Sequence, residues 1–168
     1  ERHRFRTTSD TEVLIHLYED MGLAFLQELS GMFAFTLVDT RKRKAWVVRD
    51  FYGIRPLFFM HRGDRLYFSS EIKSFLHLDR FVDDIDHEAI YHYFSLAYIP
   101  DRLTPFEAVR EIQGGWLLEV DLETKRFEEK EYYQVVFTPD RSMDEATATR
   151  RLREEMIDAV ERNLISDA

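Results

Sequence analysis

The sequence predicts an α+β fold, in which antiparallel strands paired as hairpins are flanked by helices. Three observations support this fold class. Apolar segments rich in β-forming residues occur in pairs, separated by short polar turns. Segments with helical spacing of apolar residues lie before and after these pairs. Finally, the 168 residues are 45% hydrophobic and 14% aromatic, which is enough to build a core and too apolar for a disordered chain.

The first helix is predicted over residues 10–21. Ser9 is followed three residues later by Glu12, which is the spacing of a capping box, and Gly22 is a suitable terminator. Apolar residues at helical spacing lie between them. A short second helical turn is expected over residues 25–29.

Two hairpins are predicted next. The first pairs Met32–Val38 with Ala45–Val48 across a polar turn, and both strands are expected to be mostly buried. The second pairs Leu57–Met60 with Leu66–Phe68 across a turn that contains Gly63.

A short helix is then expected from Ser70, and Asp86 is expected to cap a helix that ends before Pro100. A Gly114-Gly115 turn leads into the last two strands. We predict these strands at the following positions: Trp116–Asp121 and Arg126–Val136.

The composition changes after the last strand. Residues 138–141 are typical of a linker, and Ser142 and Glu145 have the spacing of a second capping box. A helix of about 24 residues is expected to follow. One stripe of this helix is apolar, and we expect sequence outside this chain to cover it. The stripe consists of Leu152, Met156, Ala159, Val160 and Leu164.

The charge balance excludes several classes of protein. The chain has 23 Lys+Arg against 32 Asp+Glu, a net charge of −9, which argues against nucleic-acid and anionic-lipid partners. No segment approaches the roughly 20 apolar residues of a membrane-spanning helix, and the start is not a secretory signal. We therefore expect a cytoplasmic protein without a membrane partner. Since the chain has no cysteine, it can supply neither a disulfide nor a thiol nucleophile.

No metal site is expected. His87 and His92 invite comparison with the HExxH zinc motif, but they are five residues apart. At about 100° per residue, they point about 140° apart on one helix. The acidic run 83–86 lacks the glycine and the distal glutamate of a calcium loop.

Two features leave a binding role open. Asp10 lies in the first turn of a predicted helix, where a carboxylate either complements the helix dipole or faces a ligand cation. The segment from Arg49 to Leu57 joins two strands, with Asp50 beside Arg49 and with Gly53 for an unusual backbone angle. It is either an internally paired connection or part of a binding surface.

Four motifs together resemble glutamine-hydrolysing asparagine synthetase. They are Ser9–Val13, Leu29–Phe35, Arg49–Leu57 and Phe68–Lys73. The resemblance continues through Tyr98-Ile99-Pro100 to Asn163–Asp167 and covers essentially the whole chain. The Arg49–Leu57 motif alone also resembles the glutaminase domain of the purine-pathway amidotransferase. The terminal helix favours the synthetase, because in that family it opens the ATP-dependent domain.

The resemblance implies a two-domain organisation. Residues 1–137 would be the C-terminal portion of a class II glutamine amidotransferase domain, an N-terminal-nucleophile hydrolase-like layered αββα fold with antiparallel sheets. Residues 138–168 would be a linker and the first helix of an α/β synthetase domain. The implied activity is hydrolysis of glutamine to glutamate and ammonia, followed by amidation of aspartate through an acyl-adenylate, with ATP and Mg²⁺ as cofactors. A homodimer is left open.

The resemblance also assigns roles to residues. Asp10 matches the aspartate of the family's Ser-Asp pair, which receives the α-ammonium of glutamine. Arg49, Asp50 and Gly53 are assigned to the scaffold and the domain interface. No catalytic residue is expected in this chain, because the family's cysteine nucleophile, its Asn-Gly-Glu segment and its ATP-binding loop are absent from the sequence. The chain alone is therefore expected to be inactive.

Two alternatives stay open. One is a relative such as the β-lactam synthetases, whose amidotransferase-like domain is structural. The other is a non-enzymatic interaction domain that presents the stripe from Leu152 to Leu164 to a partner helix.

Overall fold

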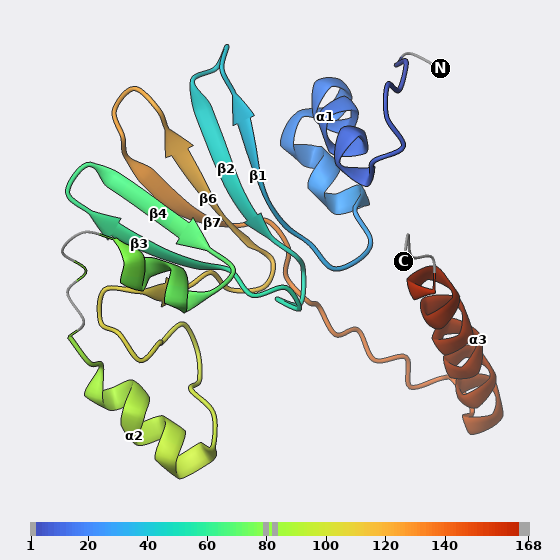
Figure 1. Ribbon diagram of the computed structural model, residues 1–168. Helices are drawn as coiled ribbons and strands as arrows, with labels where there is room; N and C mark the ends of the chain where they lie inside the picture. Colours follow the sequence, from blue (N-terminus) through green and yellow to red (C-terminus); the bar gives the residue numbers. More distant parts are fainter. Residues whose placement is uncertain (1–2, 79–80, 82–83, 165–168) are drawn as a thin grey trace. The chain divides into compact units, whose positions relative to one another are not determined.

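The computed structural model describes residues 3–78, 81 and 84–164 (Figure 1). The chain divides into two units, Glu1–Gln134 and Val135–Ala168. Of the residues used above, Asp83 and the Ile165-Ser166-Asp167 end of the last motif lie outside the described ones. Within the described residues, every helix is too short or too polar to span a lipid bilayer.

Two antiparallel sheets form the body of the first unit (Figure 1). The four-stranded sheet has the order β1-β2-β6-β7, with bounds Ala34–Asp39, Lys44–Arg49, Trp116–Asp121 and Phe127–Glu131. The three-stranded sheet has the order β4-β3-β5, with bounds Arg65–Ser69, Phe58–Arg62 and Arg110–Glu111.

Helical segments accompany both sheets. In the first unit these are α1 (Asp10–Met21), η1 (Gly22–Glu28), η2 (Ile72–His77) and α2 (His87–Leu96). The described part of the second unit contains α3 (Glu145–Asn163).

The two sheets pack face to face. Val47 of β2 and Leu118 of β6 form a buried cluster with Phe59 of β3 and with Ile112, which directly follows β5. Consecutive residues of a strand point to opposite faces of the sheet. The residues next to these in each strand therefore point away from the other sheet.

The outer faces of the sheets are covered by helical segments. Trp46 of β2 packs with Phe25 and Leu26 of η1, and residues of α1 join this cluster. On the other side, Met60 of β3 packs with Phe75 of η2. The order of layers is therefore helix, sheet, sheet, helix, which confirms the predicted α+β layered fold.

Two strand predictions need correction. β1 was expected to be mostly buried, but it is the edge of its sheet and alternates between exposed and half-buried residues. The last strand was expected to reach Val136, but β7 ends at Glu131. The backbone N–H groups of Tyr132 and Tyr133 both donate to the carbonyl of Gly115 instead of continuing the ladder.

The first predicted capping box is half correct. The side chain of Ser9 caps α1 by accepting a hydrogen bond from the N–H of Thr11 at 3.3 Å. The Glu12 side chain does not accept a hydrogen bond from the N–H of Ser9, as a capping box requires. Its carboxylate accepts from the N–H of Arg6 at 2.8 Å and of Thr7 at 2.7 Å, so it holds the segment before the helix. Hydrogen bonds, foremost from the Thr7 hydroxyl, lower the pKa of Glu12 to about 2.

The second capping box is wrong. Asp144 caps α3 by accepting from the N–H of Thr147 at 2.8 Å, whereas Ser142 donates to Asp140. The helix has 19 residues, fewer than expected. Its apolar stripe is exposed, with Leu152 at 62% and Met156 at 60% of the accessible surface.

A cluster around Glu119 on the four-stranded sheet makes the stability of the fold depend on pH. Lys44 donates to Glu119 at 2.6 Å, Trp46 donates to it at 3.0 Å, and Lys130 lies 3.2 Å away. These contacts, with Lys44 first, lower the pKa of Glu119 from 4.5 to about 2. The stabilisation is therefore complete above pH 4.5 and is lost as the pH falls from 4.5 towards 2.

We expect Glu119→Gln to lower the free energy of unfolding at pH 7, and we expect this difference to shrink as the pH falls through that window. Denaturant unfolding at several pH values measures it. Glu128→Gln is the control, because the exposed Glu128 contacts only Lys130 of this cluster. If the unfolding free energies of Glu119→Gln and the native chain differ by the same amount at every pH, the ionised Glu119 is not the source of the stabilisation.

Candidate functional site

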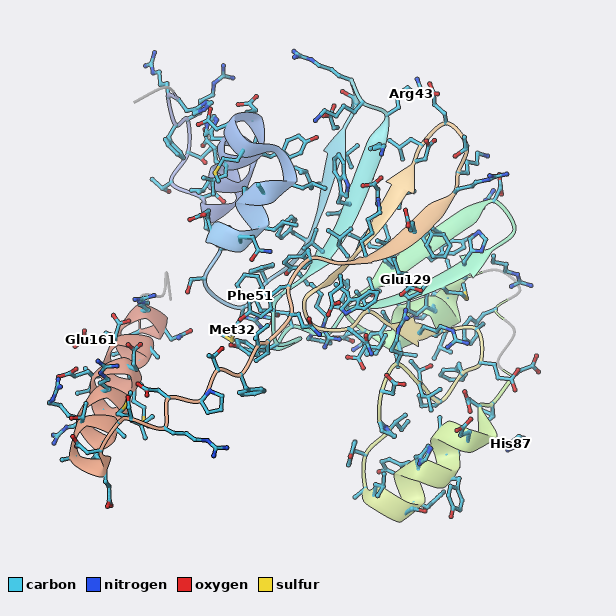
Figure 2. All side chains as sticks on the ribbon, turned by 180° about the vertical axis from the view of Figure 1, so that it is seen from behind. Met32, Arg43, Phe51, His87, Glu129 and Glu161 are labelled. Carbon is cyan, nitrogen blue, oxygen red and sulfur yellow. The ribbon has the colours of Figure 1, made fainter. Side chains whose placement is uncertain are left out.

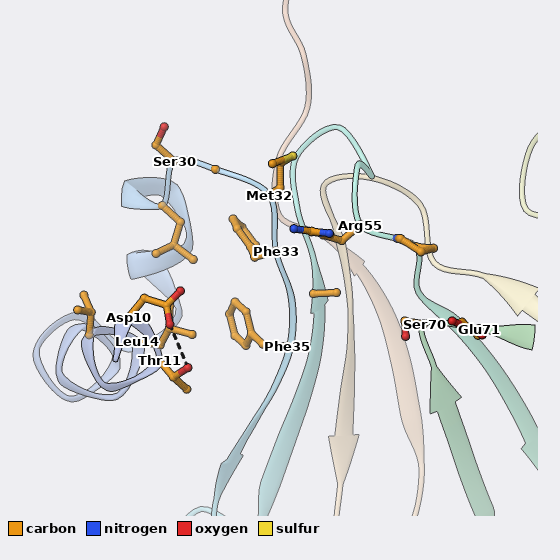
Figure 3. A pocket seen from close by; sticks show the side chains of 15 residues that line it. Asp10, Thr11, Leu14, Ser30, Met32, Phe33, Phe35, Arg55, Ser70 and Glu71 are labelled. Atoms are coloured by element: carbon orange, nitrogen blue, oxygen red, sulfur yellow. Dashed lines mark hydrogen bonds between the residues drawn. The ribbon is translucent and has the colours of Figure 1, made fainter. Parts of the chain in front are cut away.

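A cavity of about 850 Å³ lies in the first unit (Figure 3). It is bounded by the start of α1, the segment before β1, the end of the loop between β2 and β3, and the segment before η2. Its polar lining residues are Asp10, Thr11, Ser30, Arg55, Ser70 and Glu71, and its apolar walls include Leu14, Phe33 and Phe35.

Asp10 is exposed at the first position of α1 and lines this cavity. The hydroxyl groups of Ser9 and Thr11 approach its Oδ1 at 3.5 and 3.3 Å, which are long distances for hydrogen bonds between oxygens. Among the described residues, no cation lies within ion-pair distance of Asp10. Because Ser9 provides the helix cap, the carboxylate of Asp10 is available to a ligand.

Two other charged residues line the cavity. Glu71 is already neutralised by Lys73, whose Nζ lies 2.5 Å from its carboxylate. The side chain of Arg55 projects towards Met32, on the other side of Phe33 and Phe35 from Asp10 (Figure 3). No acidic partner for the Arg55 guanidinium is found in the described part of the chain. The cavity thus offers one unpaired carboxylate and one unpaired guanidinium.

Arg49 holds the loop that ends at Arg55. Its buried guanidinium donates to the carbonyl of Arg55 at 2.8 Å and to that of Gly53 at 2.6 Å. It also donates to the carbonyl of Ile112 and pairs with Glu111 at 2.7 Å. One side chain therefore fastens the loop to the end of β5.

Asp50 organises the same loop from inside. It is 1% exposed, and its carboxylate accepts from the N–H groups of Tyr52 at 3.2 Å, Ile54 at 2.9 Å and Arg55 at 2.9 Å. Its own N–H donates to the carbonyl of Phe33 at 2.9 Å. Asp50 therefore connects two walls of the cavity.

Gly53 meets the backbone requirement predicted for it. Its φ is +65°, and a Cβ at this position would lie 3.0 Å from Cζ of Arg49. The loop is thus an internally paired connection, which confirms the first interpretation. Through Arg55 it also lines the cavity, and its role in a binding surface stays a prediction. The structure brings Arg49, Asp50 and Gly53 together and places Asp10 across the cavity from Arg55. The assignment of the three residues to a domain interface stays a prediction.

Two residues of this region were not predicted to belong to it. Arg55 was part of the motif but was not predicted to face a cavity. Tyr132 was not singled out, yet its hydroxyl donates to the backbone carbonyl of Arg49. Burial, with the charge of Asp50 adding to it, raises the pKa of Tyr132. No sequence signal marks it, because its partner is 83 residues away.

Most of the chain matches a known protein family. Residues 1–133 match the family described as "Glutamine amidotransferase domain". Asparagine synthetase [glutamine-hydrolyzing] 2 of Bacillus subtilis (strain 168) is 49% identical over 72 residues, which are 43% of this chain and 10% of that protein. A putative asparagine synthetase [glutamine-hydrolyzing] of Mycobacterium bovis is 39% identical over 114 residues, 66% of this chain and 18% of that protein.

Another relative extends over nearly the whole chain. Asparagine synthetase [glutamine-hydrolyzing] 1 of Bacillus subtilis is 29% identical over 165 residues, which are 98% of this chain and 26% of that protein. The chain therefore spans about a quarter or less of the length of these relatives.

A solved structure has the same fold. The glutamine phosphoribosylpyrophosphate amidotransferase from B. subtilis, complexed with ADP and GMP, aligns with a TM-score of 0.52 at 22% identity. The alignment covers 80% of this chain and 25% of that one. This likeness confirms the N-terminal-nucleophile hydrolase fold with antiparallel sheets.

Proposed function

Because the chain belongs to the family of glutamine amidotransferase domains, we propose that it is part of a glutamine-dependent asparagine synthetase. Such an enzyme hydrolyses glutamine to glutamate and ammonia, and the ammonia then amidates aspartate. Its substrates would be glutamine, aspartate and ATP, and its location the cytoplasm. The asparagine synthetases among the relatives support this proposal.

The observation that carries the proposal is the position of Asp10. A carboxylate that faces a cavity without a cationic partner is suited to a ligand ammonium group. Phe33 and Phe35 form apolar walls of the same cavity. We infer that Asp10 receives the α-ammonium group of glutamine.

The contribution of this chain to hydrolysis is binding and orientation. With its α-ammonium fixed on Asp10, glutamine would present its side-chain amide to a nucleophile. The chain has no cysteine to supply that nucleophile. We therefore assign no covalent step to its residues.

ATP and Mg²⁺ belong to the proposed amidation of aspartate. The sequence contains no GxGxxG and no GxxxxGK[ST] motif, and the described residues form no glycine-rich loop between a strand and a helix. The described residues therefore do not fit the nucleotide.

We predict that Asp10→Asn raises the KM for glutamine about 10- to 100-fold in the native protein, with a smaller change in kcat. A charge-assisted hydrogen bond is worth about 1.5–3 kcal/mol, which corresponds to this range. Steady-state glutamate formation measures the effect. The helix should remain intact, because Ser9 and not Asp10 caps it.

Glu71→Gln is the matched control for this experiment. It removes a carboxylate from the same cavity, but one that Lys73 already neutralises, so we expect the KM for glutamine to stay within about 2-fold. Asparagine formation from free ammonia should be unchanged in both variants. Equal KM values for Asp10→Asn and Glu71→Gln would overturn the role of Asp10.

A further inference from the structure

A cluster of two histidines and three carboxylates shares no residue with the cavity lining. His3 lies in the segment before α1, and His16 lies on α1. Their imidazole rings stack with centroids 4.4 Å apart and an interplanar angle of 28°. Both side chains are mostly shielded from solvent, at 23% and 19% exposure.

Both histidines turn the same ring atom towards one carboxylate oxygen. Oε2 of Glu19 lies 3.6 Å from Nδ1 of His3 and 3.4 Å from Nδ1 of His16. In a tetrahedral Zn²⁺ site with bonds of about 2.0–2.1 Å, neighbouring ligand atoms are about 3.3 Å apart. A ligand atom from each of the three side chains lies within 4.8 Å of the others. The two nitrogen–oxygen separations are therefore close to those around one shared ion, and all three ligand atoms lie near enough to converge on it after a small adjustment.

The opposite ring atoms face further carboxylates. Nε2 of His3 lies 3.0 Å from Oδ1 of Asp20, and Nε2 of His16 lies 3.4 Å from Oε1 of Glu12. Metal-binding histidines usually turn their second nitrogen to a carboxylate, which fixes the tautomer and leaves the first nitrogen to the metal.

The cluster satisfies itself only in part by hydrogen bonding, through Nδ1 of His16 and Glu19 at 3.4 Å. Both Nε2 atoms are buried, and within the described part of the chain neither has a partner in hydrogen-bond geometry. Two imidazole nitrogens and one carboxylate oxygen form a known zinc donor set, which leaves the fourth position to water.

We propose that His3, His16 and Glu19 bind a divalent transition-metal ion, for which Zn²⁺ has the matching geometry. Asp20 and Glu12 face the second nitrogens of the two imidazoles at ion-pair distance. His3 and His16 are thirteen residues apart, so the ion fastens the segment before α1 to the helix. This segment leads directly to Asp10, but the metal site does not depend on the function proposed for that residue.

Titration of the metal-free full chain with Zn²⁺ tests the site, with the dissociation constant obtained by competition against a chromophoric chelator. We expect one Zn²⁺ per chain, and we expect His16→Gln and His3→Gln each to weaken binding about 100-fold. The His3 variant leaves the sequence of α1 unchanged, so its loss of affinity cannot arise from an altered helix. His87→Gln, at an exposed histidine of α2 (Figure 2), should bind like the native chain.

Two further measurements identify the site. Asp20→Asn should weaken binding about 10-fold without changing the stoichiometry, because Asp20 supplies a negative charge beside the second nitrogen of His3 and does not contact the ion. Bound Co²⁺ should give the intense visible absorption of four-coordinate cobalt in the native chain and lose it in His16→Gln. Failure to bind Zn²⁺, or the same affinity in His16→Gln, His3→Gln and His87→Gln, would overturn the proposal and leave the histidines as partners of the carboxylates only.

Discussion

Replacing Asp50 by alanine is expected to lower the free energy of unfolding of the first unit by about 3–5 kcal/mol. The substitution removes the acceptor of three backbone N–H groups, those of Tyr52, Ile54 and Arg55. Hydrogen bonds to a charged acceptor are worth about 1.5–3 kcal/mol each, and contributions that share one carboxylate do not add in full. Urea unfolding of the chain measures the loss, and Asp50→Asn, which keeps one carbonyl acceptor, should fall between alanine and the native chain.

Asp121→Ala is the matched control for this experiment. Asp121 lies in the same unit and accepts hydrogen bonds from the N–H groups of Glu123 at 2.9 Å and Thr124 at 2.7 Å, but these bonds are exposed, so water can replace the carboxylate. We expect a loss below about 1 kcal/mol. If Asp50→Ala costs no more than Asp121→Ala, the buried carboxylate does not organise the loop.

Gly114→Ala is the second substitution with a large expected effect, about 3 kcal/mol or more. A Cβ on Gly114 would lie 2.6 Å from the backbone nitrogen of Gly53 and 2.7 Å from the carbonyl carbon of Tyr52. Both atoms belong to the backbone of the loop that Arg49 and Asp50 hold. No flexible side chain can move away, so the loop itself must shift, and Arg55 with it.

Gly63→Ala separates this steric effect from the loss of glycine flexibility. Gly63 has a φ of +61° and open space around its Cα, so alanine there should cost only about 1–2 kcal/mol of backbone strain. Thermal or urea unfolding of both variants gives the comparison. Equal losses would contradict the close packing of Gly114 against the loop.

Features with a local cause could be predicted from the sequence. The helix that begins after Ser9, the helix capped by Asp86 and both hairpins depend on residues within a few positions of one another, and the structure contains all of them. The capping boxes were less successful. Glu12 and Ser142 each had more than one partner within reach, and spacing alone does not decide between them.

Features with a distant cause could not be predicted. The last strand ends at Glu131 because the next two N–H groups bond to Gly115, and Arg49 reaches the carbonyl of Ile112 across 63 residues. His3 and His16 have no motif spacing and meet only because the segment before α1 folds back along the helix. Asp10 was found through the family resemblance, since its position in the sequence is equally compatible with a role at the helix terminus.

Glutamine hydrolysis by the native protein that contains this chain tests the central claim most directly. We predict equimolar glutamate and ammonia from the native protein, and no release above a buffer blank from the 168-residue chain alone, because it has no thiol nucleophile. A native protein that leaves glutamine intact would contradict the account and favour a structural domain of the β-lactam-synthetase kind. Ammonia release by the isolated chain would equally contradict it, because the chain would then contain a nucleophile of its own.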